Sequence, residues 1–304
     1  MESLFWKYLA MQNKKDFEEH LRAAGTEYGC DKVVPHNYHF FYANHFLDYV
    51  DRPFKLLEIG VGGEGREVGG ASLRLWAEVF PLAEIYGLDI YDKSALNTDR
   101  IKTFIVDQGN SASLLNFVNK HGPFDIIIDD GSHKRSDQLT SLFTLISSVV
   151  PGGYYVIEDY FTSYWPVYDG STLAKDFLDT PVRWLKQSID IINRNNMLSD
   201  DVKQLVPDWG VEELHVYPGV SFLKKGLQAV RSEIPAGDFF DNQIELDEQR
   251  YGEYKALFFD HAKDPMTNLT LLHKIKKDVE RKIARIQATA GSESSGGAQD
   301  DSAL

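Results

Sequence analysis

The chain carries a repeating pattern of short apolar runs and longer amphipathic stretches from Lys55 to Tyr160. Each of five runs has the length and β-branched content of a buried strand and ends in glycine, proline or acidic residues. Each intervening stretch places apolar residues at helical spacing. Strands that alternate with helices predict βαβ units, and therefore a mostly parallel α/β sheet with helices on both faces. The predicted strands begin at Lys55, Glu84, Lys102, Phe124 and Tyr154, and the predicted helices cover 70–80, 111–120 and 139–150.

The regions on either side of this pattern differ from it in character. Apolar residues at helical spacing over 2–24 are followed by an aromatic stretch with His36, His39 and His45. Together they predict a helical N-terminal segment or lid, in which the histidines pack rather than bind metal. Two last strands are predicted to meet at a Pro-Gly turn, and a later basic amphipathic helix at 269–288 is predicted to serve packing or oligomerisation. The expected divisions are 1–52 (N-terminal segment), 53–228 (main domain), 229–290 (helical C-terminal extension) and 291–304 (disordered tail).

Composition and charge argue against several classes of protein. Thirty-two basic residues against 46 acidic ones give a net charge of −14. That charge disfavours nucleic acid or an anionic membrane as the main partner. The single cysteine, Cys30, excludes an internal disulfide and a cysteine-rich zinc site, and it fits a reducing compartment. The N-terminus is too charged for a signal peptide, and no apolar run approaches membrane-spanning length. We therefore expect a soluble cytoplasmic protein without membrane insertion.

Carboxylates follow two of the predicted strands. Asp129 and Asp130 end the fourth strand, His133 follows three residues after Asp130, and Glu158 and Asp159 end the fifth strand. If the two strands are neighbours, their ends lie about 5 Å apart. Four carboxylates at one place are unfavourable unless some are protonated or a cation lies among them.

The chemistry of these side chains indicates what they bind. All-oxygen ligands favour Mg²⁺, Mn²⁺ or Ca²⁺ over zinc. Adjacent strand residues point to opposite faces of a sheet, so we assign Asp129 to a cofactor and Asp130 to the cation. An imidazole such as that of His133 is suited to take a proton near neutral pH.

A glycine-rich loop after the first strand predicts an adenosine-type cofactor. Gly60, Gly62 and Gly65 form a GxGxxG pattern, which lets a ligand approach backbone N–H groups. Asp89 ends the second strand, where a carboxylate accepts hydrogen bonds from ribose hydroxyls. Gln108, after the third strand, lies where an adenine amino group is recognised. NAD and S-adenosylmethionine both fit these positions.

Three features favour S-adenosylmethionine over NAD. Glu58 lies inside the first strand, two residues before the first glycine. A second pair of glycines precedes the helix that begins near Ser72, whereas a dinucleotide pyrophosphate requires the helix to start at once. Hydride transfer also has no use for the clustered carboxylates at the fourth and fifth strands.

Over residues 25–170 the sequence resembles the metal-dependent sugar O-methyltransferases of the mycinamicin and macrocin type. The segments that carry the resemblance are TEYGCDKVVPHNYHFFY, LLEIGVGG, GGASLRLW, GLDIYDKS, DQGN, IDDGSH and VIEDYFTSYWP, in this order. The resemblance implies a Rossmann-like class I methyltransferase fold, S-adenosylmethionine and Mg²⁺ as cofactors, and methylation of a sugar hydroxyl. It implies Asp130, Glu158 and Asp159 as metal ligands, His133 as general base, and Tyr28, Glu58, Gly60, Ser72, Asp89 and Gln108 at the cofactor site.

Several alternatives stay open at this point. Macrolide-pathway members of the family carry a larger N-terminal domain that this sequence does not show, which favours a glycoside or glycan acceptor in general. The acceptors left open are a sugar on a natural product, a terminal residue of a surface polysaccharide and a catechol-like diol. A homo-oligomer is one candidate assembly. The GxGxxG pattern with Asp89 also fits an NAD(P)-dependent oxidoreductase or epimerase. A non-catalytic protein with a cofactor-binding fold is a third reading.

Overall fold

The computed structural model describes residues 13–63, 68–171, 179–197 and 203–226. These residues belong to one compact unit that spans Met1–Glu233. The expectations for the C-terminal extension and the tail lie outside the described residues. No helix among the residues described is both long enough and apolar enough to cross a bilayer.

A seven-stranded sheet forms the centre of this unit, in the order β3-β2-β1-β4-β5-β7-β6. The first five strands in the chain are parallel, and β7 runs antiparallel to both β5 and β6. The predicted Rossmann-like, mostly parallel sheet is therefore confirmed. The strands are β1 (Phe54–Ile59), β2 (Ala83–Asp89), β3 (Ile101–Ile105), β4 (Phe124–Asp129), β5 (Val149–Glu158), β6 (Val211–Val216) and β7 (Val220–Lys225).

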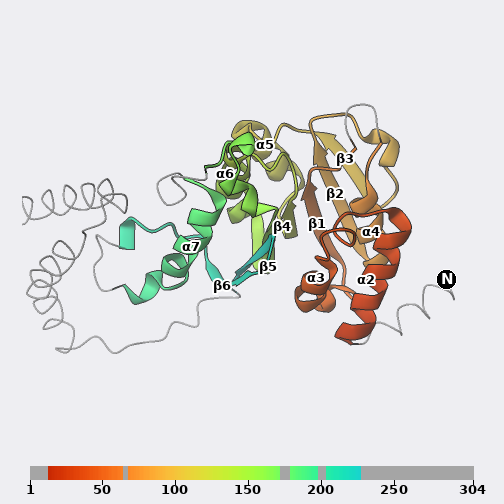
Figure 1. Ribbon diagram of the computed structural model, residues 1–304, viewed down its shortest axis with the longest axis horizontal. Coiled ribbons are helices and arrows are strands. Elements are labelled where there is room, and N and C mark those ends of the chain that lie inside the picture. The colour runs from red at the N-terminus through yellow and green to blue at the C-terminus, as the bar shows by residue number, and fades with distance from the viewer. Residues whose placement is uncertain (1–12, 64–67, 172–178, 198–202, 227–304) are drawn as a thin grey trace, which may run out of the picture. The chain divides into compact units, whose positions relative to one another are not determined.

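Helices cover both faces of the sheet, as Figure 1 shows. Side chains from α2, α3 and α4 pack in one apolar core with strand residues such as Leu56 and Ile126. Side chains from α5, α6 and α7 pack in a second core with the alternate strand residues, such as Leu57 and Ile127. The helices are α2 (Lys14–Tyr28), α3 (His39–Phe46), α4 (Ala71–Val79), α5 (Ser111–His121), α6 (Arg135–Leu145) and α7 (Pro181–Ile192). Short 3-10 turns are Leu47–Tyr49, Ser94–Leu96, Ile146–Ser148, Tyr160–Tyr164, Pro166–Tyr168 and Arg194–Asn196.

Helix α2 extends further than the sequence pattern indicates. It continues through Gly25 to Tyr28 and ends at Gly29, whose left-handed φ of 67° lets its N–H bond to the carbonyls of Gly25 and Thr26. Gly25 is required inside the helix, because a Cβ there would lie 2.1 Å from the side chain of Val33. The loop after α2 is therefore packed directly against the helix. The histidines of this region pack as predicted, with the His45 ring 4.3 Å from that of Phe222.

The prediction of a helix over 139–150 followed by a strand at Tyr154 is wrong at both ends. The helix α6 begins at Arg135 and ends at Leu145, and β5 begins at Val149. The Pro-Gly-Gly sequence at 151–153, which normally stops an element, lies within β5 because Val149 already pairs with Phe124. A change of register between Phe124 and Ile126 accommodates the extra residues.

Strand pairing brings the predicted site residues to one edge. Asp129 is opposite Ile59 of β1 and opposite Ile157 of β5. The next residues along, Asp130 and Glu158, therefore lie at neighbouring strand ends, as predicted. In open α/β sheets this carboxyl edge is where ligands bind.

Candidate active site

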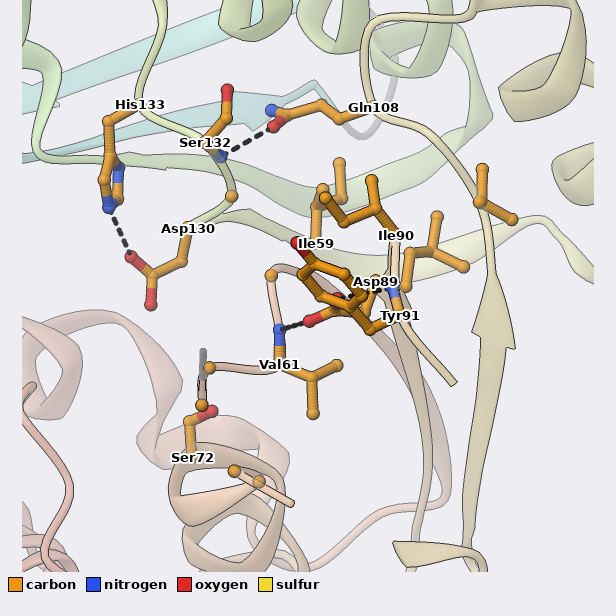
Figure 2. A pocket seen from close by; sticks show the side chains of 18 of the residues that line it. Ile59, Val61, Ser72, Asp89, Ile90, Tyr91, Gln108, Asp130, Ser132 and His133 are labelled. Atoms are coloured by element: carbon orange, nitrogen blue, oxygen red, sulfur yellow. Dashed lines mark hydrogen bonds and ion pairs between the residues drawn. The ribbon is translucent and has the colours of Figure 1, made fainter. Parts of the chain in front are cut away.

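A cavity of about 940 Å³ opens at the carboxyl ends of β1 to β4. Its wall combines the glycine-rich loop with the ends of the strands, as Figure 2 shows. Seven residues predicted from the sequence line it: Gly60, Gly62, Ser72, Asp89, Gln108, Asp130 and His133. The third glycine of the motif, Gly65, lies outside the described residues.

Asp89 holds two loops of this cavity together. Its Oδ2 accepts a hydrogen bond of 3.1 Å from the Val61 N–H, and its Oδ1 accepts one of 2.9 Å from the Tyr91 N–H. A carboxylate oxygen has two acceptor sites, so each oxygen retains capacity for a ligand hydroxyl. The geometry suits recognition of a vicinal diol such as that of ribose.

Gly60 directly follows β1 and lies against the backbone that follows β4. Its φ of 87° lies in the left-handed region, and a Cβ there would lie 2.0 Å from the Asp130 carbonyl oxygen. The Gly60 N–H donates to the Leu88 carbonyl at 2.8 Å, and the Asp130 N–H donates to the Ile59 carbonyl at 2.9 Å. Only glycine satisfies both the backbone angle and this close approach.

Gln108 connects the cavity with the opposite face of the sheet. Its Oε1 accepts a hydrogen bond of 2.9 Å from the Ser132 N–H, and its Nε2 donates to Asp129 Oδ1 at 2.6 Å. Asp129 also accepts from the hydroxyls of Ser141 and Tyr155. Burial raises the pKa of Asp129 to about 6. Asp129 and Asp130 thus lie on opposite faces, as predicted, but Asp129 is completely buried behind Gln108 and does not line the cavity.

Asp130, His133 and Asp159 form a compact group beside the cavity. Ligand atoms of the three lie within 4.8 Å of one another. The His133 Nε2 is 3.9 Å from Asp130 Oδ1 and 3.8 Å from Asp159 Oδ2. His133 and Asp159 both have a left-handed backbone, with φ of 56° and 50°. Non-glycine residues in this conformation are uncommon and concentrate at functional sites.

The Lys32 ammonium contacts three of the carboxylates, and Lys32 is not among the site residues predicted from the sequence. Its ammonium lies 3.0 Å from Glu58 Oε1 and 2.9 Å from Glu158 Oε1, and it also donates to Asp130 Oδ2. Burial alone would lower the pKa of Lys32, but the carboxylates of Asp130, Glu158 and Glu58 raise it well above its ordinary value. The side chain is therefore a charged ammonium, although only 1% of it is exposed.

Further donors from the N-terminal region bind the carboxylates of Asp159 and Glu158. The Tyr38 hydroxyl donates to Asp159 Oδ1 at 2.5 Å, and the Tyr42 hydroxyl donates to Glu158 Oε1. Glu58 is also inside the protein, where its Oε2 accepts a hydrogen bond of 2.9 Å from the Trp76 indole. Burial raises the pKa of Glu58 to about 7 in spite of Lys32.

Comparison with known proteins identifies relatives of this chain, although no family model matches it. It is 43% identical over 187 residues to mycinamicin VI 2''-O-methyltransferase of Micromonospora griseorubida. The aligned region covers 61% of this chain and 47% of that protein. It is also 38% identical over 207 residues to the 8-demethyl-8-alpha-L-rhamnosyl tetracenomycin-C 2'-O-methyltransferase of Streptomyces olivaceus. Here the aligned region covers 67% of this chain and 54% of the relative. The chain is a homologue of sugar O-methyltransferases. It spans about half the length of the curated relatives it matches.

A solved structure of this group supports the same conclusion. MycE methyltransferase in complex with Mg, SAH and mycinamycin VI superposes with a TM-score of 0.64 at 39% identity. The match covers 71% of this chain and 57% of MycE. The predicted family resemblance and the class I methyltransferase fold are thereby confirmed.

The donor set of this methyltransferase homologue fits a hard divalent cation. Asp130 and Asp159 place a carboxylate oxygen 3.9 Å and 3.8 Å, respectively, from His133 Nε2. Glu158 lies outside this group of three and is connected to Asp130 by their shared contact with Lys32. One ammonium, that of Lys32, contacts three of the carboxyl groups, those of Glu58, Asp130 and Glu158. Burial, and then repulsion from Asp130, raise the pKa of Glu158 well above its ordinary value. A divalent cation beside Glu158 would favour its ionised form against both effects.

Five of the predicted site residues do not line the cavity: Tyr28, Glu58, Asp129, Glu158 and Asp159. Tyr28 ends α2, and its ring lies 5.9 Å from the Arg74 guanidinium. Its neighbours Gly29 and Asp31 line the cavity, whereas Tyr28 does not.

Proposed function

We propose that the protein is an S-adenosylmethionine-dependent and divalent-metal-dependent O-methyltransferase that acts on a sugar hydroxyl of a glycoside or glycan. One observation carries the proposal. The cavity whose wall contains the adenosine-type residues Asp89 and Gln108 is also lined by Asp130 and His133 of the carboxylate and imidazole group. A methyl donor and a metal-held acceptor can therefore meet in one space. The MycE complex with Mg, SAH and mycinamycin VI supports these ligand classes.

The cofactor is expected to bind over the ends of β1, β2 and β3. Gly60, Asp89 and Gln108 line this part of the cavity. Gly60 would let the cofactor approach the backbone, Asp89 would accept from the ribose hydroxyls, and Gln108 would lie beside the adenine. Ser72 lies at the start of α4 in the same wall. Glu58 and Asp129 lie behind this wall, hydrogen-bonded to its residues Ser72 and Gln108 respectively.

The metal is expected to be Mg²⁺, Mn²⁺ or Ca²⁺, held by Asp130, Glu158 and Asp159. When bound, such an ion orients neighbouring hydroxyls of the acceptor and lowers the pKa of the one that attacks. His133 is then the group that removes the proton, because its Nε2 lies beside Asp130 and Asp159 on the cavity wall.

The reaction is an in-line displacement. A bond forms between the acceptor oxygen and the methyl carbon, the bond from that carbon to sulfur breaks, and His133 receives the hydroxyl proton. The protein must above all align the three reacting atoms, and alignment supplies on the order of 7–11 kcal/mol in favourable cases.

Removal of divalent metal tests the proposal. Treatment with EDTA is expected to abolish methyl transfer to glycoside acceptors while S-adenosylmethionine still binds, because the cofactor contacts do not involve the metal carboxylates. Activity is followed with a labelled methyl donor, and binding by calorimetry. Addition of excess Mg²⁺ should restore the rate. Full activity in metal-free buffer would remove the metal role.

A second experiment tests the cofactor half of the site. Asp89→Ala is expected to weaken S-adenosylmethionine binding by roughly 10–100-fold, since hydrogen bonds to a charged group contribute about 1.5–3 kcal/mol each. Binding is measured by titration calorimetry, with exposed Asp51→Ala as the control. Wild-type affinity in Asp89→Ala would contradict the assignment.

Thermal melting with NAD, NADP and S-adenosylmethionine distinguishes a methyltransferase from an NAD(P)-dependent oxidoreductase, because only the true cofactor raises the melting temperature.

A further inference from the structure

Lys32 is held in place by its own backbone as well as by its charge. It lies in the loop between α2 and α3, 98 residues before Asp130 in the chain. Its N–H donates to Asp31 Oδ1 at 2.9 Å, and its carbonyl accepts from the Tyr38 N–H at 2.7 Å. The next residue, Val33, packs against Gly25 of α2 with no room for a side chain on the glycine. The backbone of this loop therefore fixes the position of the Lys32 ammonium beside the carboxylates.

The contacts divide the oxygens of the carboxylates into two sets. Asp130 Oδ2 accepts from Lys32, and Asp130 Oδ1 faces His133. Asp159 Oδ1 accepts from the Tyr38 hydroxyl, and Asp159 Oδ2 faces His133. Glu158 gives Oε1 to both Lys32 and Tyr42. Each proposed metal ligand thus has one oxygen fixed by a donor from the segment 32–42. In Asp130 and Asp159 the other oxygen faces a common point.

We infer that Lys32 is a positioning residue of the metal site: it binds Asp130 Oδ2 and Glu158 Oε1 and so holds the two carboxylates together for the cation. The inference rests on the metal role proposed above. Groups behind a metal's direct ligands orient those ligands, and their loss typically weakens metal affinity by roughly 10–100-fold. Without the ammonium, Asp130 and Glu158 lose the group that bridges them, and the two adjacent carboxylates repel one another and move apart.

Two other roles for Lys32 lead to different expectations. If Lys32 only occupies the cation's place, its removal should strengthen metal binding. If it only neutralises buried Glu58, its removal should lower stability and leave metal affinity unchanged, since unpairing a buried charge is costly in itself. Metal affinity therefore distinguishes the three roles without reference to catalysis.

The test is the affinity of the metal-free protein for Mn²⁺, measured by paramagnetic resonance of the free ion, with thermal melting in parallel. Lys32→Met keeps a side chain of similar length without the charge, and it is expected to weaken Mn²⁺ binding by roughly 10–100-fold. Tyr38→Phe is expected to weaken it in the same direction. Tyr49→Phe is the matched control, because the Tyr49 hydroxyl donates to the distant Gly152 carbonyl, and its affinity should equal that of the wild type.

A second variant keeps the inference testable if Lys32→Met does not fold. In Lys32→Met combined with Glu58→Gln, the charge left unpaired on Glu58 is removed, while Asp130 and Glu158 still lack their shared partner. Weak Mn²⁺ binding by the double variant supports the inference. Wild-type or tighter binding by either variant overturns it while the metal role stands. A wild-type protein that binds no Mn²⁺ overturns both.

Discussion

Replacement of His133 by alanine is expected to lower turnover by about 10²–10⁴-fold, the usual contribution of general base catalysis, while S-adenosylmethionine affinity changes little. The reason is geometric. The imidazole is the titratable group on the cavity wall that faces the oxygens of both Asp130 and Asp159. The Thr162 hydroxyl fixes the backbone from which it projects, by donating to the His133 carbonyl at 2.8 Å. Single-turnover rates and cofactor titrations measure the two quantities separately.

The left-handed backbone of His133 requires a second variant as a control. Asparagine tolerates a φ of 56° better than alanine does, so His133→Asn removes the base with less strain. Both variants should lose turnover to a similar extent. His121→Ala, in the aromatic cluster around Phe117 and away from the cavity, should retain it. Near-normal turnover in His133→Asn would remove the base assignment.

The sheet was predictable because its strands are short apolar runs bounded by turn residues. The run from Phe124 to Asp129 is an example, since three isoleucines followed by carboxylates have few alternatives to a buried strand. The start of β5 was not predictable in this way. Whether Val149 joins the sheet depends on pairing with Phe124, a contact between residues far apart in the chain, whereas the local Pro-Gly-Gly sequence indicates a stop.

The carboxylates of the site were predictable for a related reason. Parallel strands bring their carboxyl ends to one edge, so acidic residues that follow neighbouring strands must approach each other. Lys32, Tyr38 and Tyr42 do not follow from this rule, because they come from a loop and a helix that precede the first strand. The one available signal was the charge itself, since crowded buried carboxylates require a compensating cation. The sequence does not say which lysine provides it.

The N-terminal segment therefore has two roles that its aromatic composition did not separate. Phe46 and Tyr42 pack in the core against the sheet, as an aromatic segment beside a sheet is expected to do. The same helix and its preceding loop also direct polar groups to Glu158 and Asp159. Packing on the sheet thus fixes the position of donors that act at the carboxyl edge. The division of the chain at residue 52 stays a prediction.

Substitution of Gly60 by alanine is expected to be the most damaging small change at the site. Two costs add at this position. An alanine with φ near 87° costs about 1–2 kcal/mol, and relief of the overlap with the Asp130 carbonyl costs about 1–3 kcal/mol more. The atom that must yield belongs to the backbone that carries Asp130. A displacement of about 1 Å there is expected to reduce turnover roughly 10²-fold even in the folded fraction.

Gly62→Ala is the matched comparison for this effect. Gly62 also has a left-handed φ, of 72°, but no heavy atom of the described residues lies within 4 Å of the added Cβ. Chemical denaturation should therefore show a loss of about 1–2 kcal/mol for Gly62→Ala from strain alone, and a loss roughly twice as large for Gly60→Ala. Equal losses would mean that the backbone after β4 yields without cost. In that case Gly60 would serve the turn alone, and the close approach of β1 to Asp130 would not position the proposed metal ligand.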